Sequence, residues 1–130
     1  MTIVAAFIPN QYGQAALTAG ISEATLRGEK LVVVNATKGD AWVDTHFASD
    51  AQVASVEAEL ANLEHGHEVR QSDGSDIAEQ ILDVVRETDA SLLVIGIRHR
   101  SPIGKMFMGS TAQTLILDCP CPVLAVKAAK

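Results

Sequence analysis

The chain is poor in cysteine, in aromatic residues and in long apolar runs. Aromatic residues make up 4% of its 130 residues, and its two cysteines, Cys119 and Cys121, are separated by a single proline. This spacing is a poor geometry for a mutual disulfide and supplies only two metal ligands, so we interpret both as ordinary thiols in a reducing compartment. Because the N-terminus also lacks a signal-peptide pattern, the sequence predicts a cytoplasmic protein.

The charge balance and hydrophobicity exclude several classes of partner. No apolar stretch approaches the roughly 18 residues of a membrane-spanning helix, so no membrane partner is expected. Acidic residues outnumber Lys and Arg by 16 to 10, and the resulting net charge of −6 disfavours binding to the phosphates of DNA or RNA. The length and a hydrophobic content of 48% suit one packed domain over residues 1–130.

Short apolar runs rich in β-branched residues predict four buried parallel strands, at residues 3–8, 31–34, 92–95 and 123–126. A fifth, more polar run at 67–71 suits an edge strand, and the residues that follow it, 72–74, are predicted to form a turn. Between these runs, apolar residues recur at helical spacing in four stripes. The stripes are Ala16, Leu17, Gly20, Ile21 and Ala24; Val53, Val56, Leu60 and Leu63; Ile77, Ala78, Ile81, Leu82 and Val85; and Ala112, Leu115, Ile116 and Cys119.

This alternation of strands and helices predicts an α/β fold. Asp76, with Glu79 three residues later, has the pattern of a capping box and predicts the start of the third helix. Right-handed crossovers then favour a single doubly wound, open parallel sheet of five strands in the order 3-2-1-4-5, with helices on both faces.

A long loop without acidic residues joins the fourth strand to the fourth helix. No Asp or Glu occurs between Asp89 and Asp118, and the segment GIRHRSPIGKMFMGST begins at Gly96 within this interval. In a sheet of the predicted order the first and fourth strands are neighbours. Ligands are therefore expected where the loops after Ile8 and Ile95 meet.

Residues of this loop have the chemistry of a phosphate site. Gly96 and Gly109 permit unusual backbone angles and close approach of a ligand. Ser110 and Thr111 lie in the first turn of the predicted helix, where free N–H groups and the helix dipole attract anions. Positive charge comes from Arg98, His99, Arg100 and Lys105. The same residues also fit a helix cap, turn glycines and a solvated basic surface, so both interpretations stay open.

The chain resembles the universal stress protein family over nearly its whole length. The resemblance is carried by the segments IVAAF, QAAL, LVVVNA, DGSDIAEQIL, DASLLVIG and CPVLAVK. It is also carried by the spacing of Gly96 and the pair Gly109-Ser110, which begins thirteen residues after Gly96. It implies a Rossmann-like sheet of the adenine nucleotide alpha hydrolase type and a stress-response signalling or protective role. It also implies binding of ATP, or of AMP or ADP, with Mg²⁺ as an accompanying ion, through a motif G-x2-G-x9-G-[ST].

Site residues follow from the same resemblance. The phosphates would lie against Gly96, Arg98, His99, Arg100, Gly109, Ser110 and Thr111, and the adenine against Phe7, Ile8, Val34 and Ile95. Two positions depart from the motif: His99 stands where a glycine is expected, and Ile8 stands where nucleotide-binding members carry an acidic residue. Two alternatives therefore accompany the ATP-binding interpretation: a member that has lost the nucleotide and acts as an interaction protein, and a slow ATPase. No catalytic residue and no protein ligand for a metal is assigned.

The last predicted strand, from Val123 to Val126, raises a question about assembly. It is apolar on both faces, yet the predicted order places it at the edge of the sheet. Exposed apolar edges pair with other chains unless they are covered. We therefore predict a homodimer in which this strand pairs with its counterpart around a two-fold axis, an arrangement that also resembles the usual dimer of the family.

Overall fold

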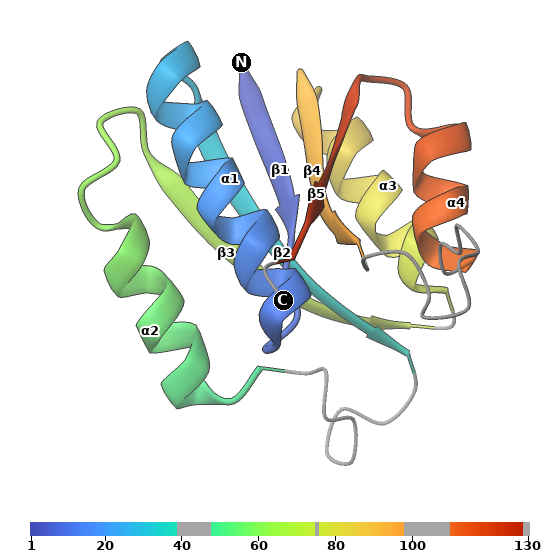
Figure 1. The fold of residues 1–130 in the computed structure, drawn as a ribbon, viewed down its shortest axis with the longest axis horizontal. Helices are drawn as coiled ribbons and strands as arrows, with labels where there is room; N and C mark the ends of the chain where they lie inside the picture. The colour runs from blue at the N-terminus through green and yellow to red at the C-terminus, as the bar shows by residue number, and fades with distance from the viewer. Residues whose placement is uncertain (39–47, 75, 98–109, 129–130) are drawn as a thin grey trace.

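In the part of the chain that the structure describes, five parallel strands alternate with four helices (Figure 1). The computed structural model describes residues 1–38, 48–74, 76–97 and 110–128. The order of elements is β1 (Thr2–Ala6), α1 (Gln11–Arg27), β2 (Lys30–Lys38), α2 (Asp50–Leu60), β3 (His67–Gly74), α3 (Ile77–Thr88), β4 (Leu92–Ile97), α4 (Ser110–Asp118) and β5 (Val123–Lys127). The strands form one sheet in the order β3-β2-β1-β4-β5, which confirms the predicted α/β topology.

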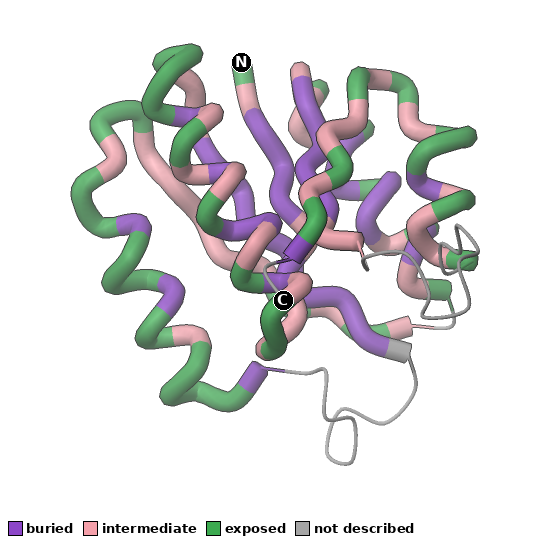
Figure 2. The backbone as a smooth tube through the Cα atoms, in the orientation of Figure 1, coloured by how far each residue is buried: buried purple, intermediate pink, exposed green. Residues whose placement is uncertain are grey.

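Two layers of helices cover the two faces of the sheet (Figure 1). Side chains of α1 and α2 pack with one set of strand residues, and side chains of α3 and α4 pack with the other. The central strand β1 supplies both layers, because Ile3 and Ala5 point toward α1 whereas Val4 points toward α3 and α4. The tube in Figure 2 is accordingly buried along the central strands and exposed along the outer sides of the helices.

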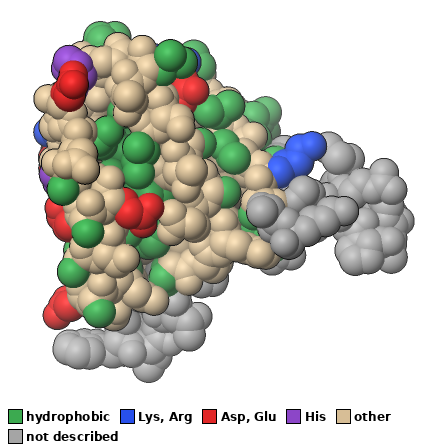
Figure 3. All heavy atoms as spheres, turned by 60° about the vertical axis from the view of Figure 1, so that its left-hand side comes forward, with side chains coloured by type: hydrophobic (Ala, Val, Ile, Leu, Met, Phe, Trp, Pro, Cys, Tyr) green, Lys and Arg blue, Asp and Glu red, His purple; other side chains and the backbone are tan. Residues whose placement is uncertain are grey.

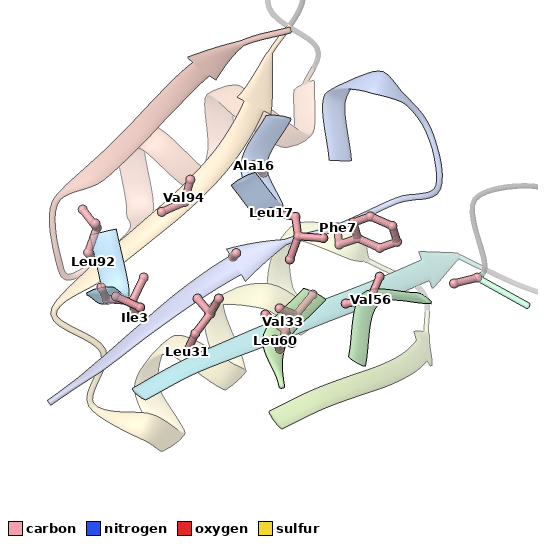
Figure 4. Packing of buried hydrophobic residues seen from close by; sticks show 13 residues of the cluster. Ile3, Phe7, Ala16, Leu17, Leu31, Val33, Val56, Leu60, Leu92 and Val94 are labelled. Carbon is pink, nitrogen blue, oxygen red and sulfur yellow. The ribbon is translucent and has the colours of Figure 1, made fainter. Parts of the chain in front are cut away.

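The predicted apolar stripe of α1 is the contact between that helix and the sheet. Ala16, Leu17 and Ala24 are buried at relative exposures of 1% or less, and they pack against Ile3 and Leu31 from the strands. Figure 4 shows these side chains together with those from α2 on one face of the sheet. The stripe contains small residues, so the helix axis can lie close to the strands.

Polar side chains define where three of the helices begin. The Asn10 side chain caps α1, and the Asp76 side chain accepts a hydrogen bond from the Glu79 N–H (3.2 Å), as the sequence predicts for α3. At α2, Ser49 and Gln52 form a capping box that the apolar pattern alone did not indicate.

Three sequence predictions need correction in the structure. β1 ends at Ala6, so Phe7 and Ile8 follow the strand. The predicted turn at 72–74 is wrong: β3 runs to Gly74 because β2 is longer than its apolar run and pairs with it up to Lys38 and Gly74. Ile116 was expected on the buried face of α4, but its relative exposure is 37% and Leu115 alone is buried there.

The described surface carries mixed side chains. On the face in Figure 3, acidic side chains lie at separate places among hydrophobic and polar atoms, and the basic side chains drawn in colour form no extended patch. Within the ranges that the structure describes, no helix has the length and hydropathy needed to cross a membrane.

Two leucines of α1 test the assignment of its buried face. Leu17 is fully buried, whereas the relative exposure of Leu26 is 80%. We expect Leu17→Ala to lower the free energy of unfolding by about 3 kcal/mol, because it leaves a cavity against the sheet. Leu26→Ala is the matched control and should change it by less than about 0.5 kcal/mol. Urea denaturation measures both, and equal losses in the two variants would contradict the packing described above.

Candidate functional site

A cleft of ≈ 350 Å³ opens at the carboxyl ends of the central strands. It lies between the sheet and the helices α3 and α4, where β1 and β4 run side by side. This is the switch point of the sheet, where ligands of open α/β folds bind. The lining residues are Ala6, Phe7, Ile8, Asn10, Tyr12, Gly13, Val34, Ala36, Ile77, Ile81, Ile95, Gly96, Ile97, Thr111, Ala112 and Leu115.

The cleft is apolar over most of its wall. Its floor consists of strand residues that face α3 and α4, and among them Ala6 and Ala36 are small enough to leave space above the sheet. Ile81 of α3 and Leu115 of α4 are buried and form the two sides. Such a wall favours a flat, apolar group over a charged one.

Two glycines let the first turn of α1 reach the cleft. A Cβ atom on Gly13 would lie 1.8 Å from the carbonyl oxygen of Ile8, and a Cβ on Gly96 would lie 1.9 Å from the carbonyl oxygen of Tyr12. Gly96 is a residue of β4, and the described glycines with positive φ are Gly28 and Gly66. Gly96 therefore does not use the positive φ that glycine permits, and the close approach that the structure shows at this residue is to the backbone of α1.

The amino ends of α1 and α4 both border the cleft. Asn10, Tyr12 and Gly13 line it from α1, and Thr111 lines it from the first turn of α4. Neither helix has an acidic residue in its first turn. The Asn10 side chain accepts from the N–H groups of Tyr12 (3.0 Å) and Gly13 (3.1 Å), which satisfies two of the free donors of α1. The positive ends of two helix dipoles thus border this region, and the described residues that line it include no carboxylate.

A buried amide holds the rim of the cleft beside β1. Asn35, with a relative exposure of 1%, donates from Nδ2 to the carbonyl oxygen of Phe7 (2.9 Å). Its Oδ1 accepts from the Ala48 N–H (2.8 Å) and from Gln71 Nε2 (3.1 Å). Gln71 also donates to the carbonyl oxygen of Ala48 (2.8 Å). One side chain of β2 therefore ties the end of β1 to β3 and to the residue that precedes the cap of α2.

A second polar group fixes α3 against the sheet. Gln80 donates from Nε2 to the carbonyl oxygen of Thr37 (2.8 Å) and accepts from the Ser72 hydroxyl (2.6 Å). Gln80 lies between the cleft residues Ile77 and Ile81 on α3. These bonds hold the α3 side of the cleft at a fixed distance from β2 and β3. Neither hydrogen-bond network was predicted from the sequence, although the polar Asn35 directly after an apolar run is a signal for the first of them.

Charged groups with shifted pKa values lie outside the described lining. On β3, the hydrogen bond from Arg70 lowers the pKa of the Glu68 carboxyl, and the same contact raises the pKa of Arg70. Arg70 also donates to Glu87 (3.0 Å) on α3. Among the residues that the structure describes, no group of three His, Cys, Asp or Glu side chains could hold a metal ion.

The structure brings together most of the predicted site residues that it describes. Phe7, Ile8, Val34, Ile95, Gly96 and Thr111 all line the cleft. Ser110 is the first residue of α4 and is exposed, and it is not among the lining residues. The remaining predicted residues, Arg98, His99, Arg100 and Gly109, lie outside the described residues, as does Lys105. Unpredicted lining residues come mainly from α1, α3 and α4, including Asn10, Tyr12, Ile77, Ile81, Ala112 and Leu115.

Comparisons with known proteins agree on one group of relatives. The sequence profile of the Universal stress protein family matches residues 1–127. A curated universal stress protein of Mycolicibacterium smegmatis is 50% identical over 125 residues, which cover 96% of this chain and 96% of that protein.

Solved structures show the same fold. A universal stress protein from Archaeoglobus fulgidus superposes with a TM-score of 0.80 at 28% identity and covers 98% of both chains. A structure of the universal stress protein from the same organism in complex with dAMP has a TM-score of 0.73 at 23% identity, again covering 98% of both chains. At this level of sequence identity, the similarity to the second structure shows that the two proteins share a fold.

Replacing Gly96 tests the contact between α1 and β4. We expect Gly96→Ala to lower the free energy of unfolding by at least about 2 kcal/mol, because the new methyl group would overlap the carbonyl oxygen of Tyr12. Gly74→Ala is the matched control at the end of another strand. Its Cβ would lie 3.2 Å from Nε2 of Gln80, a tight contact that a shift of a few tenths of an ångström relieves, so the expected loss is under about 1 kcal/mol. Chemical denaturation distinguishes the two, and a Gly96→Ala protein as stable as the unmodified chain would refute the contact.

Proposed function

Since the chain belongs to the universal stress protein family, we propose that its cleft binds an adenine nucleotide, with ATP as the principal ligand. The observation that carries this proposal is the combination of an apolar cleft with two helix amino ends that lack acidic residues. An apolar wall suits the base, and helix amino ends suit the phosphates. The volume of ≈ 350 Å³ falls in the range of small-molecule sites.

The adenine would lie against the floor of the cleft. Val34 and Ile95 project from β2 and β4 on the side of α3 and α4, and Ile8 borders the same space from the end of β1. A flat ring buried among these side chains gains free energy from the loss of apolar surface to water. Phe7, whose carbonyl oxygen is held by Asn35, keeps this wall in place.

The phosphates would extend toward the first turn of α4. Thr111 lines the cleft there, and Ser110 precedes it with an exposed side chain. Hydroxyl groups and free N–H groups at a helix amino end donate to phosphate oxygens. Gly96 lies near the end of β4, and the residues that precede α4 in the sequence, which lie outside the described residues, include the further candidates Arg98, His99, Arg100 and Gly109.

Binding is a better proposal than hydrolysis for this cleft. The described lining residues include no carboxylate, histidine, lysine or arginine that could activate water, and Ile8 stands where a carboxylate would otherwise assist. A Mg²⁺ ion would therefore arrive with the nucleotide phosphates and would be held by them. We propose that the protein is a signalling or protective factor of the cytoplasm that is regulated by its ligand. The competing functions are slow ATP hydrolysis and interaction with other proteins by a chain that binds no nucleotide.

Filling the cleft tests nucleotide binding directly. Ala36 is buried and lines the floor, so Ala36→Leu should place a branched side chain in the space for the base. We expect the affinity for ATP in the presence of Mg²⁺, measured by calorimetry, to fall at least about tenfold, equivalent to about 1.4 kcal/mol.

The matched control for this test is Ala58→Leu, on the exposed side of α2. It adds the same atoms away from the cleft and should leave the affinity unchanged. Thermal melting of both variants verifies that each is folded. Equal ATP affinity in the two folded variants would refute the proposal that the nucleotide binds in this cleft. If the unmodified chain bound no ATP, the alternative of an interaction protein without nucleotide would be favoured. Phosphate release over several hours would favour the slow ATPase.

We further propose that β5 pairs with its counterpart in a homodimer. β5 is an edge strand whose residues Val123, Leu124 and Val126 are half-buried within the single chain. The Leu93 N–H donates to the Pro122 carbonyl oxygen (3.0 Å), and the Ala128 N–H donates to the Ile97 carbonyl oxygen (3.4 Å). The backbone N–H and C=O groups of the even-numbered residues of β5 therefore point toward β4. Because these groups alternate along a strand, the N–H of Ala125 points toward the free edge of the sheet.

A proline at position 125 tests the edge pairing. Ala125→Pro removes the outward N–H without taking a donor from the bonds to β4, so we expect a monomer by sedimentation analysis. Ala125→Val retains the N–H, so we expect it to be a dimer in the same measurement, as we also expect of the unmodified chain. A dimer that persists in the folded proline variant would refute pairing through β5.

A further inference from the structure

The two cysteines meet at the junction between α4 and β5. Cys119 follows the last residue of α4, and Cys121 lies two residues before the start of β5. Their Sγ atoms are 3.5 Å apart, and both are free, half-buried thiols packed against the core that α3 and α4 share with the sheet. The sequence predicted a poor geometry for a mutual disulfide, whereas the fold places the sulfur atoms in contact.

Both ends of this short segment are anchored. The Cys119 N–H donates to the Leu115 carbonyl oxygen (3.0 Å), which continues the hydrogen bonding of α4. The Pro122 carbonyl oxygen accepts from the Leu93 N–H of β4 (3.0 Å), which begins the pairing of β5. Between them, Pro120 restricts the backbone φ angle. The sulfur atoms therefore have little freedom to separate, which gives each a high effective concentration near the other.

We propose that Cys119 and Cys121 are a dithiol site that reacts reversibly with low-molecular-weight disulfides to form an intrachain disulfide. A disulfide needs an S–S distance of about 2.05 Å, which side-chain rotation can supply from the observed contact. One protein thiolate attacks the small disulfide, forms a mixed disulfide and releases one small thiol. The second protein thiolate then attacks the protein sulfur of the mixed disulfide and releases the other small thiol. Two protein S–H groups are oxidised, and one small disulfide is reduced to two thiols.

The local environment assigns the order of attack. Burial raises the pKa of the Cys121 thiol to about 12, and the hydrogen bond and charge of Cys119 add to this shift. Cys121 is therefore protonated at neutral pH, and Cys119 makes the first attack. A mixed disulfide on Cys119 has no S–H group and cannot form a thiolate, so the contributions of Cys119 to the raised pKa of Cys121 are absent in that state, which assists the second attack by Cys121.

The product belongs to the labile class of disulfides. The closed loop contains only the proline between the two cysteines, so it removes little entropy from the unfolded chain. Small, strained and partly exposed disulfides have high reduction potentials and are readily reduced. The site would thus stay reduced in a reducing compartment and respond when small disulfides accumulate. It lies between α4, which lines the cleft, and β5, which forms the sheet edge.

The test uses the full chain equilibrated with mixtures of reduced and oxidised glutathione, quenched with acid and alkylated with N-ethylmaleimide. Trypsin places both cysteines in one peptide, because no Lys or Arg occurs between Lys105 and Lys127. We expect this peptide to lose two hydrogen atoms, to carry no glutathione or maleimide, and to regain both thiols in dithiothreitol. Pro120→Gly should lower the yield of intrachain disulfide several-fold at the same ratio of oxidised to reduced glutathione, because it loosens the segment.

Single-cysteine variants supply the matched controls. Cys121→Ser should form a stable glutathione adduct on Cys119, because no second thiol can displace the glutathione. Cys119→Ser should react much more slowly at neutral pH and faster as the pH rises, because Cys121 must first lose its proton. Glutathione on both cysteines of the unmodified chain would overturn the proposal. So would disulfide-linked dimers in place of the intrachain bond, or full alkylation under conditions that glutathionylate Cys121→Ser.

Discussion

The cleft depends on the close approach of the first turn of α1 to the ends of β1 and β4. Gly13 and Gly96 make this approach possible, because a Cβ at either position would lie within 2 Å of a backbone carbonyl oxygen. With that contact in place, the Asn10 cap and the residues after it form one border of the site. The same contact directs the positive end of α1 at the switch point, where the strand order reverses. The position of the cleft thus follows from a backbone contact rather than from a charged side chain.

Polar side chains around the cleft form hydrogen bonds within the protein that hold the neighbouring elements in place. Asn35 and Gln80 form hydrogen bonds with backbone and side-chain partners on β2, on β3, directly after β1 and directly before the cap of α2. Buried polar groups of this kind specify one arrangement, because breaking any bond leaves an unsatisfied partner away from water. The wall that faces the cleft can therefore be apolar while its position is still fixed. Polar groups behind the wall thus fix its position, and apolar groups face the cleft, which suits the proposed recognition of a base by shape and of phosphates by helix amino ends.

The α4–β5 connection links three features of the molecule. α4 supplies Thr111, Ala112 and Leu115 to the cleft, β5 supplies the open edge of the sheet, and the cysteine pair lies between them. Leu115 takes part in two of these features, since its side chain lines the cleft and its carbonyl oxygen accepts from the Cys119 N–H. A change in covalent state at the cysteines would consequently occur one helical turn from the cleft wall. The cleft, the edge strand and the cysteine pair proposed as a dithiol site are thus connected through α4 and β5.

The order of strands and helices, the sheet topology and membership of the universal stress protein family could all be predicted from the amino-acid sequence. Apolar periodicity and right-handed crossovers are local or nearly universal rules, so they can be applied to Val4, Leu17 or Val94 without a structure. The composition of the cleft and the contact between the cysteines could not be predicted in this way, because they depend on packing between elements that are distant in the sequence. Ala36, Ile81 and Leu115 come from three separate elements, and their convergence depends on how closely the helices pack. Strand ends such as Gly74 were likewise decided by pairing with a neighbour, because hydrogen bonding across a sheet extends a strand beyond its own apolar run.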